Sequence, residues 1–478
     1  MLNNTRRTPS MRASLVVCAG LLTCATSSLL PVSPAMADPD PRSQNASRAT
    51  NITTANVNRL RRAWYVPTND PCSHMPLVQG NRVYFADWGG DVYCVDSRTG
   101  RQIWKKAGLE KPKKMWPWHG FAGTGALGDG MLFEASTEGN AFALDANTGR
   151  VIWKRRITSD PHAGSISQLF HHNGLLYIGL SSVEEALDAK KSGFKPNFQG
   201  KVLALNPRTG ATVWERALVT PPHNGVAVWS SFALDAPANT LYFTTGNNYP
   251  GQATALSDSI VAVDSRTGAV RWYRQTTPHD VWTKGNPKGP DYDFAGGPQL
   301  FEATINGRLR RLVGAGQKSG IFWVWDRVTG EPVWHTTIGY GAVDGGIHGE
   351  ASIGNGRIYV WSNNNYLHTM PPEKHPINIK ALDTATGRMI WSKNTMQPAW
   401  LNSAGFLSND VYLVGSLDGR LRAYRAWDGK KLWVSQKQGP IVASLAVAGN
   451  TVFFPTAKPK MFGKWASGPQ GVYAYTLR

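Results

Sequence analysis

The chain has 478 residues, a formal net charge of +19, 49 glycines, 19 tryptophans and four cysteines. Its length exceeds that of an ordinary single domain, its few cysteines exclude a disulfide framework, and the lack of a Cys-x-x-Cys-His segment excludes a covalently attached c-type haem. No nucleic-acid motif accompanies the basic charge, so we interpret it as a generally basic surface and expect no nucleic-acid partner.

The N-terminal region predicts an exported protein. A basic start is followed by the largely apolar run Leu15–Leu30 and then by Ala35-Met36-Ala37, a small-x-small cleavage site. We therefore expect residues 1–37 to be a signal peptide cleaved near Ala37, and the mature protein to be secreted or periplasmic. The pair Arg6-Arg7 leaves twin-arginine export open. No later segment is apolar for long enough to span a membrane, and the polar residues 38–58 predict an extended N-terminal segment.

A short pattern, small-x-Asp-x-x-Thr-Gly-x-x-x-Trp, recurs through the rest of the chain. Ala143–Trp153 is a clear copy, and Ala423–Trp433 is a degenerate one because Asp428-Gly429 replaces Thr-Gly. The copies return roughly every 40 to 60 residues, which is the period of propeller blades. The other copies are Cys94–Trp104, Ala204–Trp214, Ala262–Trp272, Val324–Trp334 and Ala381–Trp391.

Each copy predicts a strand, a tight turn and a returning strand. The alternating apolar run before the turn, such as Gly200–Leu205, is typical of a strand. In the turn, the Asp side chain can accept hydrogen bonds from nearby backbone amides, and Gly can take a positive φ. The final Trp is too large for one hairpin to bury. We therefore expect it to pack against the next blade, with the small first residue leaving room for the indole.

The two ends of the repeat region complement each other. Gly471–Arg478 has the strand and Ala474 but no turn and no Trp, whereas Leu60–Val66 has the returning strand and Trp64 with nothing before it. We predict that residues 60–66 form the outer strand of the last blade. Seven copies and this split copy predict an all-β fold, an eight-bladed β-propeller of four-stranded antiparallel blades over residues 59–478, closed into a ring.

Signal cleavage would leave Cys72 and Cys94. Cys94 occupies the small position of the first blade motif, which favours a buried packing thiol. A disulfide between the two residues is the alternative.

Four insertions lie between strands of the repeats, and long insertions on a repeat scaffold usually collect on one face and carry function. Three of them bring acids or amides next to predicted strands, in Ser181–Glu185, Thr245–Tyr249 and Gly289–Gly297. Each acid alone is typical of a turn. Because strand ends of successive blades converge near the central channel, however, we expect a hard-cation site of carboxylate and amide oxygens. The insertions are Leu180–Gly200, Thr245–Ser259, Thr276–Pro298 and Ser362–Asn378.

Several stretches are more specific than the blade motif, which non-catalytic propellers share. They are Tyr84–Gly90, Tyr177–Glu185, Ala227–Ser231, Leu241–Tyr249, Thr277–Trp282, Gly289–Gly297 and Gly314–Gly320. In these stretches the chain resembles the pyrroloquinoline-quinone-dependent alcohol dehydrogenases, and their polyvinyl-alcohol branch in particular, over residues 50–478. In many members of the family the catalytic site has the motif His-Asp-x-Trp-Asp. Here Thr283 follows Trp282, and an insert moves the acids to Asp291-Tyr-Asp293, as in that branch.

The resemblance implies residues that hold the cofactor. Trp229 would form the floor under pyrroloquinoline quinone, although it could be one more packing indole. Lys318 would contact the quinone oxygens, and the Ser167 hydroxyl would bond the cofactor. Glu184 and Asn247 would hold a cation, Ca²⁺ or alternatively a lanthanide, against the quinone.

The resemblance also implies a catalytic pair. Asp291 and Asp293 lie in the stretch that matches the catalytic aspartate. We expect Asp291 to be the base and to lie among the metal ligands, and Asp293 to add a further carboxylate to the metal.

The activity implied by the resemblance is the two-electron oxidation of an alcohol, with secondary or polymeric alcohols favoured. An aspartate would take the hydroxyl proton while hydride moves to the quinone, and the cation would polarise the quinone carbonyl. Electrons would then pass to a separate acceptor such as a cytochrome c.

Two other hypotheses stay open. The family's adjacent cysteine pair and an arginine that contacts the quinone have no clear equivalent here, which leaves a degenerate quinoprotein without cofactor as one alternative. A non-catalytic binding or assembly propeller would use the same blades.

Overall fold

The computed structural model describes residues 40–113, 119–190, 193–363, 377–395, 404–458 and 468–478. All of them belong to the compact unit Pro34–Arg478. The expected signal peptide and most of the insertion Ser362–Asn378 lie outside the described residues. Within those residues the regular elements are strands, apart from the 3₁₀ helix η1 (Val57–Arg59) and the short helix α1 (Glu184–Leu187).

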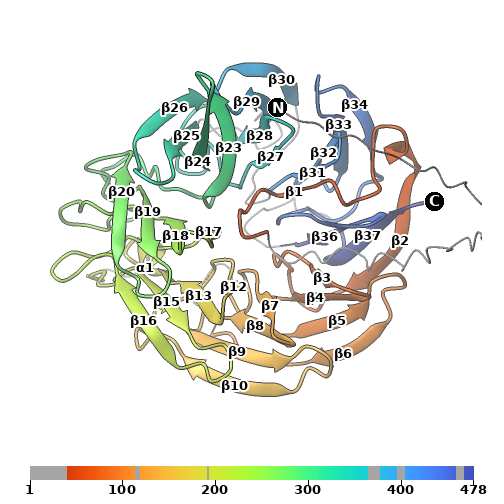
Figure 1. Ribbon diagram of the computed structural model, residues 1–478. Coiled ribbons are helices and arrows are strands. Elements are labelled where there is room, and N and C mark those ends of the chain that lie inside the picture. Colours follow the sequence, from red (N-terminus) through yellow and green to blue (C-terminus); the bar gives the residue numbers. More distant parts are fainter. Residues whose placement is uncertain (1–39, 114–118, 191–192, 364–376, 396–403, 459–467) are drawn as a thin grey trace, which may run out of the picture. The chain divides into compact units, whose positions relative to one another are not determined.

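Eight antiparallel sheets form a ring of blades (Figure 1), which confirms the predicted eight-bladed β-propeller. The first four blades are β3 (Leu77–Gln79), β4 (Arg82–Ala86), β5 (Val92–Asp96) and β6 (Gln102–Lys106); β7 (Ala126–Gly128), β8 (Met131–Ala135), β9 (Asn140–Asp145) and β10 (Val151–Arg156); β12 (Phe170–His172), β13 (Leu175–Gly179), β15 (Lys201–Leu205) and β16 (Thr212–Ala217); and β17 (Ala233–Asp235), β18 (Thr240–Thr244), β19 (Ser259–Asp264) and β20 (Val270–Gln275).

The core lies between neighbouring blades. Phe133 of the second blade and Leu203 of the third, for example, belong to one buried apolar cluster.

The other four blades are β23 (Gln299–Ile305), β24 (Arg308–Gly316), β25 (Ile321–Asp326) and β26 (Pro332–Thr337); β27 (Ser352–Gly354), β28 (Arg357–Asn363), β29 (Ile377–Asp383) and β30 (Met389–Thr395); β31 (Phe406–Ser408), β32 (Val411–Gly415), β33 (Leu421–Arg425) and β34 (Lys431–Val434); and β35 (Ala446–Ala448), β36 (Thr451–Thr456), β37 (Gly471–Leu477) and β2 (Leu60–Pro67).

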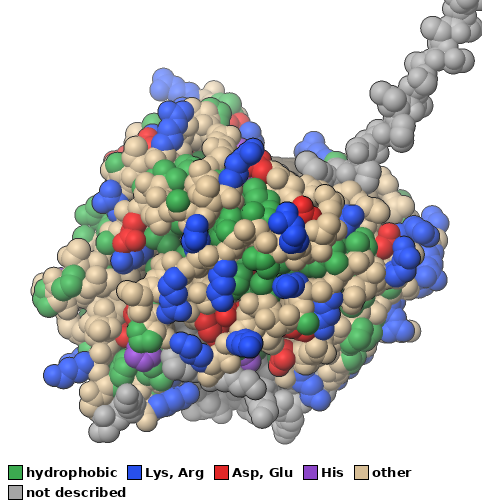
Figure 2. Space-filling view, turned by 90° about the horizontal axis from the view of Figure 1, so that it is seen from below, with side chains coloured by type: hydrophobic (Ala, Val, Ile, Leu, Met, Phe, Trp, Pro, Cys, Tyr) green, Lys and Arg blue, Asp and Glu red, His purple; other side chains and the backbone are tan. Residues whose placement is uncertain are grey.

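The basic charge is spread over the surface. Figure 2 shows one side of the molecule, on which Lys and Arg side chains are scattered between apolar and polar ones rather than gathered into one patch. This distribution agrees with a generally basic surface.

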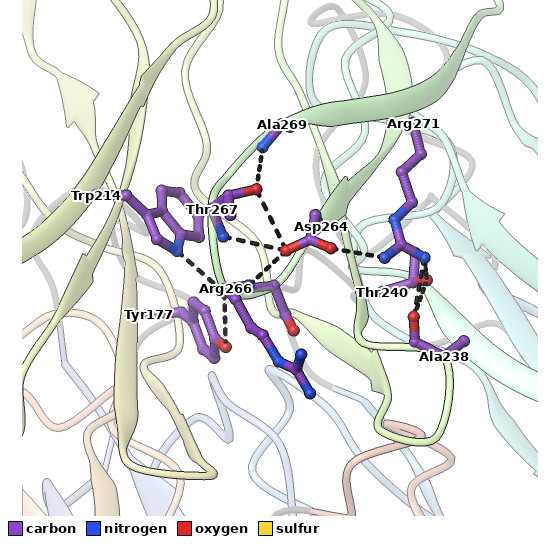
Figure 3. Close-up of polar contacts among 10 residues, drawn as sticks. Tyr177, Trp214, Ala238, Thr240, Asp264, Arg266, Thr267, Ala269 and Arg271 are labelled. Atoms are coloured by element: carbon purple, nitrogen blue, oxygen red, sulfur yellow. Dashed lines mark hydrogen bonds and ion pairs between the residues drawn. The ribbon is translucent and has the colours of Figure 1, made fainter.

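The repeated turn has the geometry expected from its sequence, as the fourth blade illustrates (Figure 3). The Asp264 Oδ1 atom accepts hydrogen bonds from the backbone amides of Arg266 at 2.9 Å and Thr267 at 3.1 Å. Gly268 has a φ of +69° and donates its N–H to the Asp264 carbonyl. The Asp side chain therefore fixes the turn, and the left-handed conformation explains the glycine.

Each motif Trp packs on the next blade, as predicted, and all but Trp433 dock on its turn; Trp433 contacts Tyr475 of β37 instead. The Trp214 indole N–H donates to the Ser265 carbonyl at 3.0 Å, and a Cβ on Gly268 would lie only 2.6 Å from the Trp214 ring. Ala204, the small first residue, pairs with Trp214 across the strands. The same indole-to-carbonyl bond is made by Trp64, Trp104, Trp153, Trp272, Trp334 and Trp391.

Ring closure also follows the prediction. β2 pairs antiparallel with β37, and Trp64 lies opposite Ala474. The Trp64 indole then donates to the Ser97 carbonyl in the first blade at 2.9 Å. The last blade is therefore built from both ends of the propeller, and its borrowed strand also docks on the first blade.

The segment before β2 runs across the middle of the ring (Figure 1). Its carbonyls accept hydrogen bonds from the innermost strands of successive blades, including Pro41 from Leu234 and Gln44 from Ile353. Part of it, β1 (Ala46–Ser47), pairs in parallel with β31. The segment helps to line a central cavity of about 220 Å³.

Both cysteines of the propeller are free and fully buried. Cys94 lies opposite Trp104 in the first blade, and burial raises its pKa to about 11. The packing interpretation of Cys94 is therefore correct, and the alternative disulfide to Cys72 is wrong.

Candidate active site

The insertions of the third, fourth and fifth blades meet one another. Asn248 of the fourth blade bridges to Gly225 on one side and to Val281 on the other. The Lys284 amide donates to the carbonyl of Glu185, which lies in α1 of the third blade. Short strand pairs stiffen these loops: β11 (Ala163–Gly164) with β14 (Ser181–Ser182), and β21 (Trp282–Thr283) with β22 (Asn286–Pro287).

A buried lysine between two aspartates forms the centre of this region. The Lys318 ammonium donates to Asp291 Oδ1 at 2.9 Å and to Asp293 Oδ1 at 3.2 Å. Lys318 is 7% exposed and Asp291 is 1% exposed. Lys318 follows β24, and the two aspartates precede β23, so neighbouring strand ends of one blade place all three.

The two carboxyl groups have different electrostatic environments. Burial raises the pKa of Asp291 well above its ordinary value, and repulsion from Asp293 and Glu185 adds to the rise despite the nearby Lys318. Burial also pushes the pKa of Asp293 upward, but the Lys318 charge and hydrogen bonds from Asp291 and Lys318 outweigh it and hold that pKa below its ordinary value. The carboxylates in turn raise the pKa of Lys318, which stays charged.

A buried acid fixes the loop that carries Asp291. Asp280 Oδ2 accepts the Tyr292 amide at 2.7 Å, and its Oδ1 accepts the Asp291 amide at 3.3 Å. Asp291 has a φ of +59°, in the left-handed region that residues other than glycine rarely occupy. Asp280 thus positions Asp291 in a conformation that the surrounding contacts must maintain.

Trp229 lies against the same cluster. The Lys318 ammonium is 5.7 Å from the centre of the Trp229 ring. Gly246 separates the indole from the acids, because a Cβ there would lie 3.1 Å from Asp293 Oδ2 and 3.5 Å from Trp229 Nε1. Trp229 is half-buried, whereas motif indoles such as Trp153 and Trp214 are buried. It therefore presents part of its ring beside a buried cation and two carboxyl groups.

Asn247 is buried with a fixed amide orientation. Its Nδ2 donates to the carbonyls of Asn248 at 2.7 Å and Trp282 at 2.8 Å. With the nitrogen held in this way, the amide oxygen is the end that remains for a cation.

Ser167 is buried in the third blade, and its hydrogen-bond partners lie in that blade. Its hydroxyl accepts the Gly179 amide at 3.1 Å and shares a hydrogen bond with Ser165 at 3.0 Å. The side chain therefore holds the edge of a strand, and the structure does not bring it into contact with the lysine cluster.

Glu184 points away from the cluster as well. Its Oε2 accepts the amides of Asn197 at 2.8 Å and Phe198 at 2.7 Å, and its Oε1 faces His162. The adjacent Glu185 is the acid influenced by the charges of Lys318 and Asp293. Burial, as the main cause, raises the pKa of Glu185 to about 7.

Sequence reasoning missed three acids of this region: Glu185, Asp280 and Asp258. Asp258 is fully buried, and neither of its carboxylate oxygens has a hydrogen-bond partner among the described residues. Burial, followed by repulsion from Asp280 and Asp293, raises its pKa well above the ordinary value. Asp280 lay in one of the specific stretches, but no sequence signal distinguished Asp258 from a strand-end acid.

Comparison with known proteins agrees with the family resemblance found in the sequence. Residues 213–338 match the family model described as glucose/ethanol/alcohol dehydrogenase, beta-propeller domain. Polyvinylalcohol dehydrogenase of Sphingopyxis sp. (strain 113P3) is 26% identical over 425 residues, which cover 81% of this chain and 64% of that relative. These matches confirm the resemblance to the quinoprotein alcohol dehydrogenases. The chain spans just under two thirds of the length of this relative, at 64%.

Solved quinoprotein structures share the fold. The quinohemoprotein alcohol dehydrogenase ADHIIG of Pseudomonas putida HK5 superimposes with a TM-score of 0.76 at 21% identity, covering 91% of this chain and 79% of that one. A europium-containing methanol dehydrogenase also gives 0.76, at 18% identity, covering 92% and 97%. Residues 377–464 match a second model, outer membrane protein assembly factor BamB. Among the described residues, none of the helices is long and apolar enough to cross a membrane.

Proposed function

We propose that the protein is a quinoprotein dehydrogenase that oxidises an alcohol with pyrroloquinoline quinone and a bound cation. The observation that carries the proposal is the buried Lys318 held between Asp291 and Asp293 beside the half-buried ring of Trp229. The relatives are named as alcohol dehydrogenases, two of them as polyvinylalcohol dehydrogenases. These names favour secondary or polymeric alcohols as substrates.

The residues of the region fit a cation and a planar quinone. Carboxyl groups outnumber cationic side chains around Lys318, and Asp258 adds a further buried acid. A metal ion would therefore offset the repulsion between these carboxyl groups. Asn247 offers an amide oxygen, and Trp229 offers a flat apolar face. We assign cofactor contacts to Trp229 and Lys318, and cation contacts to Asn247, Asp293 and Glu185.

Bound at this site, the quinone would accept two electrons as hydride from the alcohol carbon. Asp291 would take the proton of the substrate hydroxyl at a carboxylate oxygen. Burial raises the pKa of Asp291, and a bound cation beside it would add to the effect of Lys318 in favouring its ionised, basic form. Lys318 stays charged beside both acids and would hold Asp291 in place. Asp280 fixes the backbone that presents Asp291.

The ion is Ca²⁺ or a lanthanide, because both prefer carboxylate and amide oxygens. A second acid next to the base, Asp293, favours an ion of higher charge. Electrons would leave to a separate acceptor such as a cytochrome c.

We propose that residues 1–37 direct export, that residues 38–58 form an N-terminal segment and that residues 59–478 form the catalytic propeller. The enzyme would then act in the periplasm or outside the cell. N-terminal sequencing of the exported protein tests the cleavage site near Ala37.

Reconstitution tests the activity. Chelator-treated protein is titrated with pyrroloquinoline quinone in the presence of Ca²⁺ or La³⁺, with tryptophan fluorescence reporting binding and a dye-linked assay reporting oxidation of secondary alcohols and polyvinyl alcohol. We expect cation-dependent binding and turnover. Binding without turnover would indicate a degenerate enzyme, and no binding would favour the alternative below.

A non-catalytic assembly or binding propeller is the second candidate. It is favoured by the match of residues 377–464 to the assembly-factor model. This alternative gives no reason for a buried lysine between two buried aspartates.

A further inference from the structure

Three metal-binding side chains meet at the junction of the second and third blades. Asp160 and His162 follow β10, and Glu184 begins α1. One donor atom from each residue lies within 4.8 Å of the others. The His162 Nδ1 atom is 3.6 Å from Glu184 Oε1 and 3.8 Å from Asp160 Oδ1. These spacings leave room for an ion between the three groups, while direct hydrogen bonds between them would be shorter.

Glu184 is held with one oxygen unused. Its Oε2 accepts two backbone amides, from Asn197 and Phe198, which fixes the carboxylate. Its Oε1 has no hydrogen-bond partner among the described residues, although the side chain is only 1% exposed. A buried carboxylate oxygen without a partner is costly, and an ion at this position would satisfy it.

The cluster opens to solvent on one side. Asp160 and His162 are 22% and 27% exposed, and the three residues line a cavity of about 390 Å³. His162 is held by an edge contact with Phe194, whose ring centre is 5.3 Å away, and its carbonyl accepts the Val183 amide. An ion could therefore enter and keep water ligands in addition to three protein ligands fixed in place.

We propose that Asp160, His162 and Glu184 bind a divalent transition-metal ion of the Zn²⁺ type, at a site separate from the Lys318 cluster. Two carboxylates and a neutral imidazole give the site a net charge of −2, which a divalent ion neutralises. The imidazole selects Zn²⁺ and similar ions over Ca²⁺, which prefers oxygen ligands. The ion would join the segment after β10 to the insertion of the third blade.

The test uses full-length protein freed of metal by chelation. Zn²⁺ and Co²⁺ are the probes, and each is added by itself. Calorimetry gives the Zn²⁺ affinity, and the visible spectrum of bound Co²⁺ reports the imidazole ligand. We expect one Zn²⁺ site whose affinity falls roughly 10-fold or more in His162→Ala and in Glu184→Gln. We also expect bound Zn²⁺ to raise the melting temperature of the wild type and not that of His162→Ala.

Two matched variants distinguish this site from other histidines and from the Lys318 cluster. His223→Ala removes a histidine from another loop and should leave Zn²⁺ binding unchanged, which controls for nonspecific binding to histidine. Glu185→Gln alters the neighbouring acid, which is influenced by Lys318, and should also leave Zn²⁺ affinity unchanged. Equal Zn²⁺ affinity in the wild type and in folded His162→Ala would overturn the proposal. A loss of affinity confined to Glu185→Gln would overturn it as well, because the ion would then belong to the Lys318 cluster.

Discussion

Asp87 is a buried acid, outside the Lys318 cluster, whose titration should affect stability. It lies in the turn between β4 and β5, fully buried, and accepts hydrogen bonds from the Asp91 amide at 3.0 Å and the Tyr93 hydroxyl at 2.9 Å. Burial raises its pKa to about 6, against about 3.9 in an unfolded chain. Between these values the folded protein holds a proton that the unfolded chain releases. The contribution to the free energy of unfolding is therefore complete below about pH 4 and lost as pH rises through about 6.

Asp87→Asn should remove this pH dependence while keeping both hydrogen-bond partners. The free energy of unfolding of the variant should match the wild type near pH 4. It should exceed that of the wild type by about 1–3 kcal/mol at pH 7. Urea denaturation of both proteins at four pH values across this range measures the difference. Parallel pH profiles would show that Asp87 is not the titrating group.

Trp229→Ala should separate cofactor binding from packing. Because Trp229 is half-buried, we expect the variant to fold with a small loss of stability and to bind pyrroloquinoline quinone much more weakly. Trp214→Ala is the control, since Trp214 is 8% exposed and packs on the next blade; it should cost about 3–5 kcal/mol of stability. Melting temperature and quinone titration, measured on one preparation of each variant, distinguish a cofactor-binding role of Trp229 from a packing role. A large loss of stability with unchanged quinone binding would make Trp229 a packing residue.

The two aspartates should differ in their effects. Asp291→Asn should still bind quinone and metal but lose turnover, because the amide cannot accept the hydroxyl proton. Asp293→Asn should chiefly weaken metal binding or change which ion supports activity. Turnover and metal content are measured for each purified variant. Near-full activity of Asp291→Asn, together with an inactive, metal-loaded Asp293→Asn, would reverse the two roles.

The identity of the acid that faces Lys318 shows the limit of sequence reasoning at this scale. Glu184 and Glu185 are adjacent and chemically equivalent, and both lie in α1. Successive residues of a helix point about 100° apart, so only the placement of α1 decides which one faces the site. That placement depends on the amides of Asn197 and Phe198, in a loop whose path no local pattern predicts. Lys318 and the Asp291-Tyr-Asp293 stretch came from the resemblance to a family, and they lie at ends of predicted strands, where the path of the chain depends less on distant loops.

At the scale of the single blade, the glycine of the repeated turn serves two purposes. Gly268 needs both its positive φ and the missing Cβ that lets Trp214 approach, whereas Gly130 has a φ of +76° and a Cβ added there would meet no atom within 4 Å. Gly130→Ala should cost about 1–2 kcal/mol for the left-handed conformation alone. Gly268→Ala should cost clearly more, because the indole must also move. Chemical denaturation of the two variants gives the comparison, and equal losses would show that the indole contact contributes nothing.

Blades were predictable from sequence because their signals are local. The Asp, Gly and Trp of each motif mark a turn and its docking contact within eleven residues, as in Ala262–Trp272. The path of residues 41–51 was not predictable, because many of its contacts are backbone carbonyls that accept amides from distant strands. Contacts of that kind leave no pattern in the side chains.

At the scale of the whole molecule, the ring depends on β2. Deleting residues 38–67 removes this strand together with the Trp64 contact to the first blade. We expect the truncated protein to lose its cooperative unfolding transition and to be insoluble, because β37 becomes an open edge. Circular dichroism during heating and size-exclusion chromatography test this expectation. A soluble truncation that unfolds cooperatively would show that closure is dispensable.

The pairing of β2 with β37 also sets the order in which the protein can mature. Leu60 lies opposite Leu477, so β2, which is made early, must wait for almost the entire polypeptide to leave the ribosome. Contacts so distant in sequence slow folding, and a waiting strand is exposed to aggregation. We therefore expect the nascent chain to remain open until β37 has been made, and the unpaired β2 to be a site at which chaperones bind the unfinished protein.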